Sequence, residues 1–510
     1  MTSDNVAQAA NMLQECIKKL NNNKDHYVLH PGKDFSRVRC VTFEDVIRFV
    51  LCLQGTAAYN EMIRFCQEGN IGEMTLSAMI QQRSKINSSA FRDLLNSFIA
   101  FLSIDSLPTY HGYQILACDG SDINRPEDQN DASFLPLDNH PKGGYNQTHL
   151  SVLYDVMHRF YLDAEAQPKK RMDERDALLK MLKRFSLTGK SILTLDRGYE
   201  SYNVIETLNR KENMYYCIRV KNNGLRDITA LPKEELDRDL QVVVTTTQKK
   251  EDIKYNRVII HVDKRSKNGK KYSENTILSH WDYESPCPIC FRVVRFQLDS
   301  GEWETLITNL PRSEFSLLAL KDLYHMRWEI ETSFRDLKYT IGLVHLHSRK
   351  PDLIMQEIYA SLLMFNFCNK IAAEAYEYSS VKAVEQKENS NSNSDTLNNT
   401  QQHVPICADK LEQEYVNIIP FKRLGFSAQG KEMDHDNSSG VPPLKRRKYE
   451  YVIRFTSCVL LCKSYLRKKL AFDDAFLRLV GKHIIAKRPG RFDARHTKPK
   501  SFASFNYWIA

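Results

Sequence analysis

Apolar residues recur every three or four positions through most of the first 105 residues. The spacing is clearest over Val41–Phe49, Tyr59–Phe65 and Ser77–Phe101, and such a period predicts amphipathic helices. The polar turns between these helices carry basic side chains, namely Arg83, Lys85 and Arg92. A small, basic, all-helical unit is typical of a DNA-binding domain and also of a helical cap, and the pattern alone does not choose between them.

From Tyr113 the pattern changes to short, continuous apolar runs. Gln114–Cys118 and Ser191–Leu195 predict buried strands, and each run ends at an aspartate, Asp119 and Asp196. Further strands are expected at Leu150–Asp155 and Arg159–Glu165, and helices at Glu174–Phe185 and Tyr202–Asn209. Strands that alternate with helices predict an α/β sheet, and two carboxylates at strand ends predict an active site at that edge.

Residues 214–315 break this alternation. Successive runs rich in Val, Ile, Thr and Tyr predict strands at Met214–Lys221, Leu240–Thr246, Tyr255–Val262, Cys290–Leu298 and Trp303–Thr308. The stretch therefore predicts a β-rich insertion. Cys287 and Cys290 have the spacing of zinc ligands, but no second pair follows nearby, so we expect reduced core thiols.

Helical periodicity resumes at Glu314 and continues to about Tyr378. Residues 379–403 and 427–447 are polar and poor in aromatic side chains, which predicts disorder. Residues 449–480 are again apolar with a helical period. The closing stretch 482–500, which contains Arg488 and Arg491, is strongly basic, and both a solvated tail and a contact with nucleic acid fit it.

The composition supports a nucleic-acid partner without requiring one. The net charge of +9 suits a polyanion. The chain has no apolar run of about 18 residues, so no membrane span is expected, and its first residues lack the pattern of a secretory signal. We therefore expect a cytoplasmic protein that associates with the nucleoid.

One helix, expected at Leu323–Ile341, carries the most informative polar pattern. With about 100° per residue, its side chains Tyr324, Arg327, Glu331 and Lys338 share an arc of roughly 60° that borders the apolar stripe. Glu329 and Asp336 are expected on the solvent side. The pattern therefore favours Glu331 over Glu329 as a metal-binding carboxylate, although an ordinary amphipathic helix with a salt-bridged flank would show the same arrangement.

The four polar positions of this helix reproduce the Y-R-E-K signature of cut-and-paste bacterial insertion-sequence transposases with a DDE triad. Asp119-Gly-Ser121 resembles their first acidic motif, and Leu195-Asp-Arg-Gly-Tyr199 resembles the second. Tyr216–Lys221 resembles the strand that opens their insertion domain, and Pro499–Tyr507 resembles their C-terminus. The resemblance spans about residues 40–375 and the tail.

The resemblance implies a ribonuclease-H-like α/β core with an all-β insertion before the catalytic glutamate. It implies that Asp119, Asp196 and Glu331 are the catalytic residues and bind two Mg²⁺ ions, for which Mn²⁺ could substitute. Two such ions activate a water or a 3′-hydroxyl, so no Ser, Cys or His nucleophile is needed. The residues implied in DNA binding are Tyr324, Arg327, Lys338 and Arg219.

Other carboxylates and histidines compete for these roles. Asp122 follows a Gly-Ser pair that is expected to end the strand, so we favour Asp119 over it. Asp155 and Asp163 lie on the next expected strands. The histidines His149, His158, His345 and His347 are expected to be structural or to contact the substrate rather than to bind metal.

Some members of the resembled family stack a flipped base on a tryptophan of the insertion. Trp303 is the candidate here, but it lies one residue out of register, and one step along a strand reverses the face. A core tryptophan fits equally well, so the use of a hairpin intermediate stays open.

These observations predict six segments. They are a helical N-terminal domain for DNA binding (1–105), the first part of the catalytic core (106–213), a β-rich insertion (214–315), the second part of the core (316–378), largely disordered linkers (379–447), and a helical and basic C-terminal region (448–510). The predicted function is DNA transposition, in which a homo-oligomer, expected to be a dimer, cuts double-stranded transposon ends and joins them to target DNA. The alternatives are a degenerate end-binding protein and a ribonuclease-H-like nuclease that does not join strands.

Overall fold

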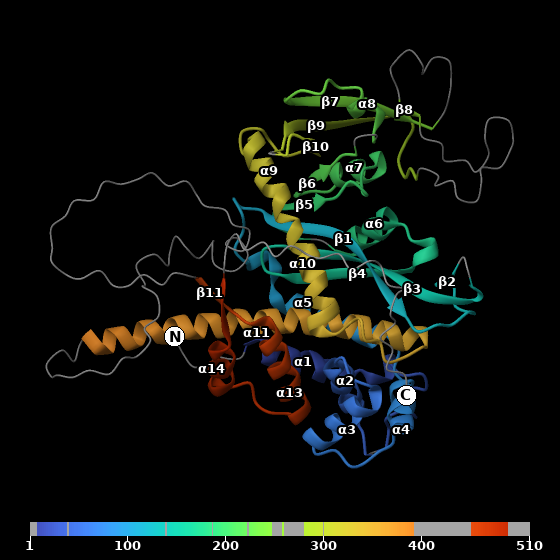
Figure 1. Cartoon of the computed structure of the whole chain (residues 1–510), viewed down its shortest axis with the longest axis vertical. Coiled ribbons are helices and arrows are strands. Elements are labelled where there is room, and N and C mark those ends of the chain that lie inside the picture. Colours follow the sequence, from blue (N-terminus) through green and yellow to red (C-terminus); the bar gives the residue numbers. More distant parts are fainter. Residues whose placement is uncertain are drawn as a thin grey trace.

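The computed structural model describes residues 8–37, 40–137, 140–185, 187–221, 224–246, 258–259, 280–298, 300–391 and 450–487. These residues form a mixed α/β structure around one large sheet (Figure 1). The strands of the sheet are β1 (Gln114–Arg125), β2 (Phe134–Leu137), β3 (His140–Asp155), β4 (Phe160–Pro168), β5 (Ser191–Leu195), β6 (Met214–Arg219), β7 (Leu236–Thr245), β8 (Val258–Ile259), β9 (Cys287–Gln297) and β10 (Trp303–Thr308).

The strand order places β1 and β5 in the interior of this sheet. The order is β2-β3-β1-β5-β6-β10-β9-β7-β8, and β4 also pairs with β3. β1 runs antiparallel to β3 but parallel to β5, which in turn runs parallel to β6. All five residues of β5 are buried, as expected for a parallel strand covered on both faces.

The helices form two groups. The helices of the first group cover the sheet or connect its strands: α6 (Glu174–Arg184), α7 (Tyr202–Asn209), α8 (Arg226–Thr229), α9 (Leu317–Met326) and α10 (Trp328–Arg335), followed by a π-helix at Asp336–Ile341. The second group is α1 (Gln8–Asn22), α2 (Phe43–Cys52), α3 (Ala58–Glu68), α4 (Leu76–Arg83), α5 (Ser89–Leu102), α11 (Pro351–Asn391), α13 (Phe455–Lys468) and α14 (Asp474–Lys482). Strands β11 (Glu450–Ile453) and β12 (Ile484–Lys487) form a separate pair.

The long helix α11 joins the two groups. In Figure 1 it runs between the sheet and helices α1, α2, α3 and α4. It packs against α1, α2, α5, α13 and α14, and also against β4. Asn366 of α11 accepts a hydrogen bond from the Tyr161 amide and donates one to the Tyr161 carbonyl, both at 2.8 Å. Its side-chain amide therefore satisfies backbone groups of β4 as a neighbouring strand would.

Local sequence signals set where several helices begin. Thr42 and Asp45 form a reciprocal capping box at α2, and Asp173 accepts two backbone N–H groups at the start of α6. Ser316 caps α9 in the same way. These side chains satisfy amides that the first helical turn leaves without intrahelical partners.

The expected β-rich stretch 214–315 continues the central sheet. Its described strands are β6, which pairs with β5, and β10, β9, β7 and β8, which follow in the same sheet. A strand at the open edge of β6 can satisfy its backbone groups, and most of the expected strand Tyr255–Val262 lies outside the described residues. Disorder is expected from the sequence over 379–403, but residues 379–391 continue α11. Residues 427–447, Arg488, Arg491 and Pro499–Tyr507 lie outside the described residues.

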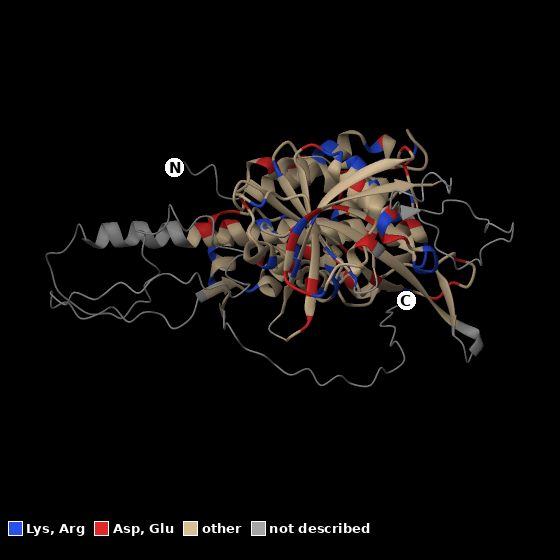
Figure 2. Ribbon diagram, turned by 90° about the horizontal axis from the view of Figure 1, so that it is seen from above, with Lys and Arg blue, Asp and Glu red and all other residues tan. Residues whose placement is uncertain are grey.

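In the described ranges no helix combines the length and the apolar character that crossing a bilayer requires. Lys and Arg alternate with Asp and Glu along the described ribbon (Figure 2), so charge alone does not single out one DNA-binding face there.

Candidate active site

The register of β1 and β5 places the two aspartates side by side. Cys118 of β1 pairs with Leu195, the last residue of β5, so Asp119 and Asp196 are the next residues on adjacent parallel strands. β1 does not end there, because β3 pairs with it without interruption from Leu116 to Arg125. The expectation that Gly120-Ser121 ends the strand is therefore wrong, and Asp119 lies within a strand at the point where its parallel neighbour stops.

Asp119 is partly buried, with 20% of its side chain exposed, and it lies among other charged groups. Its Oδ1 accepts a hydrogen bond of 2.8 Å from the Gly120 amide. Burial raises the pKa of Asp119 to about 6; Arg327 and the Gly120 amide lower it, and the nearby carboxylates Asp196 and Glu331 raise it further. The three carboxylates of the expected triad therefore lie close enough for the charges of Asp196 and Glu331 to raise the pKa of Asp119.

Arg327 connects this strand edge to the helix that carries Glu331. Its guanidinium lies 3.3 Å from Asp119 Oδ2 and 2.9 Å from Glu331 Oε1. Arg327 is buried, whereas 43% of the Glu331 side chain is exposed. A buried cation between two carboxylates offsets part of the repulsion that the cluster would otherwise have.

The segment expected as one helix at Leu323–Ile341 is divided. α9 ends at Met326, α10 begins at Trp328, and the last turn is a π-helix. Glu329, expected on the solvent side, is only 5% exposed and lies 3.0 Å from Arg159, which also pairs with Asp336 at 2.8 Å. The expectation failed because a helical wheel finds one buried stripe, while this segment is covered on two sides.

The remaining expected DNA-contacting residues surround the same region. Lys338 donates to the Asp122 carbonyl at 2.7 Å. Tyr324 is buried, and its hydroxyl has no hydrogen-bond partner among the described residues. Arg219 pairs with Glu304 at 3.0 Å, and the charges of Arg327 and Arg219 oppose the rise that burial causes in the pKa of Tyr324.

Trp303 precedes Glu304 on β10, and successive side chains of a strand point to opposite faces. Glu304 faces Arg219. Burial raises the pKa of Glu304 above its ordinary value, and the charges of Arg219 and Arg327 oppose that rise. Trp303 therefore lies on the sheet face opposite Glu304 and Arg219.

The competing carboxylates have other partners. Asp122 lies 2.6 Å from His149 Nδ1 and 2.8 Å from Lys169 Nζ. Asp155 is fully buried and accepts hydrogen bonds from the Met157 and His158 amides, and Asp163 pairs with Arg184. None of these three contacts Arg327 in the described structure.

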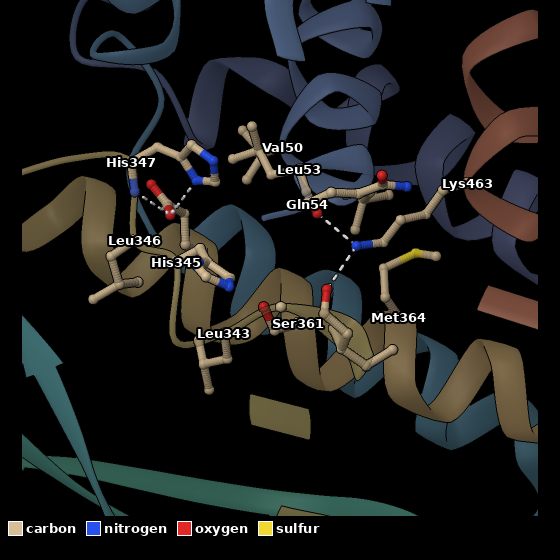
Figure 3. A pocket seen from close by; sticks show the side chains of 14 residues that line it. Val50, Leu53, Gln54, Leu343, His345, Leu346, His347, Ser361, Met364 and Lys463 are labelled. Carbon is tan, nitrogen blue, oxygen red and sulfur yellow. Dashed lines mark hydrogen bonds and ion pairs between the residues drawn. The ribbon is translucent and has the colours of Figure 1, made fainter. Parts of the chain in front are cut away.

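His345 and His347 belong to a different place. They line a pocket between α2, α11, α13 and the segment after the π-helix (Figure 3). Buried Lys463 donates there to the carbonyls of Leu53 and Ile341, and His347 contacts Glu357 and the Thr56 carbonyl. These contacts support a structural role.

Cys287 and Cys290 do not form a metal site. Cys287 is buried and Cys290 is exposed, on opposite faces of β9. The free cysteines Cys16, Cys52, Cys118, Cys217, Cys368, Cys458 and Cys462 are also buried.

Sequence reasoning missed Glu174 and the role of His149. His149 Nε2 lies 2.9 Å from Glu174 Oε1, and this pair is next to Gly120 and Gly198. A Cβ on Gly120 would lie 2.1 Å from His149 Nε2. The glycine that follows each aspartate motif was the available signal, because a glycine can mark a close approach.

The donor chemistry of the triad fits a divalent cation. Its members offer only carboxylate oxygens, which hard cations such as Mg²⁺ prefer, and the raised pKa of Asp119 shows that added positive charge would be stabilising there. Within the described part of the chain, no three His, Cys, Asp or Glu side chains are already arranged around a common metal position. Arg327 lies between two of the carboxylates instead.

Carboxylates gathered on an α/β sheet, with arginine and lysine beside them, are typical of enzymes that act on phosphodiesters with divalent metals. The family model described as the transposase DDE domain matches residues 110–367, so the chain belongs to the DDE transposase family. It is a DNA transposase, an enzyme that cleaves and joins DNA and depends on divalent metal.

The relatives are bacterial insertion-sequence transposases. The chain is 28% identical over 261 residues to the putative transposase InsL of insertion sequence element IS186A from Escherichia coli K12. This alignment covers 49% of this chain and 67% of InsL. The transposase of IS421 from Escherichia coli matches with the same identity and coverage. InsG of IS4 is 45% identical over 47 residues, 9% of this chain and 11% of InsG.

Among solved structures, the piggyBac transposase synaptic complex with hairpin DNA aligns over 74% of this chain and 77% of its own. Its sequence identity is 10% and its TM-score is 0.39.

Proposed function

We propose that Asp119, Asp196 and Glu331 are the catalytic triad of this transposase. The observation that carries the proposal is the register of the parallel pair β1 and β5, which makes the two aspartates neighbours. Glu331 joins them from α10 through the shared contact of Arg327 with Asp119 and Glu331. Residues far apart in the sequence thereby form one group of carboxylates.

We propose two Mg²⁺ ions as the metal, with Mn²⁺ as a substitute. When bound, such ions would activate the attacking oxygen and stabilise the leaving oxygen of a phosphodiester. The three carboxylates supply the ligand oxygens, and the partial exposure of Glu331 leaves a side open to solvent and substrate.

The residues beside the triad are suited to hold the DNA backbone. We assign Arg327, Lys338, Tyr324 and Arg219, the residues of the Y-R-E-K signature and of β6, to phosphate contacts near the transposon end. Arg327 must then exchange a carboxylate partner for a phosphate. Arg488 and Arg491 are proposed as further contacts, and Trp303 is left out because it lies on the opposite face.

The catalytic core is proposed to be ribonuclease-H-like. In support, the strands β4, β3, β1, β5 and β6 lie in this order in the sheet. The pairs β4–β3 and β3–β1 are antiparallel, and the pairs β1–β5 and β5–β6 are parallel. We propose that residues 1–105 form a DNA-binding unit, that residues 214–315 are the insertion, and that residues 316–378 complete the core. The proposed place of action is the cytoplasm, at the nucleoid.

The proposed reaction is cleavage at the inverted-repeat ends of a mobile element, followed by joining to target DNA, carried out by a dimer on paired ends. The test incubates the full chain with DNA that carries the inverted repeats flanking its gene, with and without Mg²⁺. We expect metal-dependent nicks at the repeat ends and joined products. Nicks without joining would indicate a nuclease, and binding without nicks would indicate a degenerate end-binding protein.

A further inference from the structure

We propose that His149 and Glu174 are positioning residues of the transposase reaction, which hold Asp119 and Asp196 at the separation that a shared divalent cation requires. The inference rests on the proposed triad. It concerns two residues that do not belong to the triad and that neither the aspartate motifs nor the Y-R-E-K positions contain.

His149 fastens the strand that carries Asp119 to the start of α6. It is the cross-strand partner of Asp122, and its Nδ1 lies 2.6 Å from Asp122 Oδ1. Its Nε2 lies 2.9 Å from Glu174 Oε1. Only 4% of the imidazole is exposed, so the ring has one buried position with a carboxylate at each nitrogen.

Glu174 fills the space between the two aspartate motifs. A Cβ on Gly120 would lie 2.9 Å from Glu174 Oε1, and a Cβ on Gly198 would lie 3.2 Å from Glu174 Oε2 and 2.9 Å from Asp196 Oδ1. The two glycines that follow the aspartates therefore leave room for the same carboxylate. A side chain at either glycine would push the Glu174 carboxylate away from its present position.

The first turn of α6 also holds the Asp196 motif directly. Arg175 Nε donates to the Gly198 carbonyl at 3.0 Å, and Asp196 Oδ1 accepts the Gly198 amide at 2.6 Å. Asp173 caps α6 by accepting the amides of Arg175 and Asp176. This cap fixes the start of the helix and therefore the positions of Glu174 and Arg175. The first turn of α6 thus lies beside the residues that follow both aspartates of the proposed triad.

The acidic side chains around His149 are balanced by basic ones. The carboxylates of Asp122 and Glu174 face the imidazole of His149, and Lys169 lies 2.8 Å from Asp122. The 2.9 Å contact with His149 is the largest cause that keeps the pKa of Glu174 below its ordinary value. Glu174 is therefore a fixed, neutralised support beside the triad rather than another free anion.

The test measures binding of Mn²⁺ alone to the full chain, by isothermal titration calorimetry without DNA. The variants are Glu174→Gln and His149→Gln. The matched control is Asp176→Asn, because Asp176 is a first-turn acid of the same helix whose partners are Gln167 and the exposed Lys180 rather than His149 or the glycines. We expect Glu174→Gln and His149→Gln to weaken Mn²⁺ binding about 10- to 100-fold, the usual effect of removing a partner that orients metal ligands. Asp176→Asn should bind as the wild type does.

Two further readouts separate positioning from folding. The melting temperature of Glu174→Gln should stay close to that of Asp176→Asn, and excess Mn²⁺ should restore its DNA cleavage. Wild-type Mn²⁺ affinity in both Glu174→Gln and His149→Gln would overturn the proposal. Wild-type affinity in Asp119→Asn would instead overturn the triad on which it rests.

Discussion

At the level of single residues, burial distinguishes two glutamates that are two positions apart. Glu329 and Arg159 are each about 5% exposed and form an ion pair behind α10, whereas Glu331 reaches Arg327 at the open side. The sequence pattern identified Glu331 correctly as the residue beside the polar group. It could not reveal the role of Glu329, because Arg159 comes from the distant β3–β4 turn.

The first prediction concerns stability at these two positions. Glu329→Gln should lower the free energy of unfolding by about 3 kcal/mol or more. The reason is that the buried Arg159 would lose one of its two carboxylate partners and keep only Asp336. Glu331→Gln should lower this free energy by less, about 1 kcal/mol, because 43% of the Glu331 side chain is exposed and Arg327 keeps its contact with Asp119. Urea denaturation of both variants measures the difference, and equal effects would contradict the burial described here.

The second prediction concerns the titration of His149. Burial lowers its pKa, but hydrogen bonds and charge from Asp122 and Glu174 raise it more, to about 8. Since this exceeds the ordinary value of 6.5, the bridge contributes its full stabilisation, at most about 2 kcal/mol, below pH 6.5 and loses it as the pH rises through 8. Lys169, which pairs with Asp122, is the nearby cation.

NMR of labelled histidine rings measures this titration directly. One ring should titrate near pH 8 in the wild type, and Asp122→Asn should move that titration to lower pH. A ring that titrates at the ordinary value in both proteins would show that His149 does not bridge the two carboxylates.

At the level of elements, contacts between distant segments decide what several basic side chains do. Arg83 is expected from the sequence to lie in a polar turn, but it is buried at the end of α4, 2.9 Å from Glu357 of α11. It also donates to the Leu353 carbonyl and to Gln356. Arg83 therefore fastens the N-terminal helices to α11 and is not free to contact DNA.

The third prediction follows from this contact. Arg83→Met should lower the free energy of unfolding by about 3–5 kcal/mol, because it leaves Glu357 in a buried place without its partner, while DNA affinity per folded molecule stays unchanged. Arg92→Met is the control, since 54% of the Arg92 side chain is exposed, and such surface changes stay within about 0.5 kcal/mol. A loss of DNA affinity in Arg83→Met without a loss of stability would contradict this role.

The fourth prediction concerns the segment from α9 to the π-helix as a support for DNA. If Arg327 and Lys338 bind phosphates, Ala at either position should weaken end binding for any sequence and reduce the salt dependence by about one unit. Binding isotherms at several salt concentrations measure the slope. An unchanged slope in both variants would mean that their contacts with Asp119, Glu331 and the Asp122 carbonyl are their whole role.

At the level of the whole molecule, the sequence predicted the bounds of some elements near the triad, although β1 and β3 are longer than expected. The bounds of β5, α7 and β10 agree with the expected ones, because short apolar runs between polar turns mark such elements strongly. The single sheet that includes 214–315 was not predictable, since nothing local shows that β10 pairs with β6. Glu174 was missed for the same reason, because only the fold brings α6 beside Gly120 and Gly198.

The most direct test of the triad is the single-turnover rate of Mg²⁺-dependent nicking at a transposon end. The variants are Asp119→Asn, Asp196→Asn and Glu331→Gln, and Asp322→Asn, an exposed acid of α9, is the control. We expect each triad variant to nick about a hundredfold more slowly or worse while it still binds the end, because affinity comes mainly from phosphate contacts. The control should nick at the wild-type rate. Wild-type nicking by any one of the three triad variants would contradict the account.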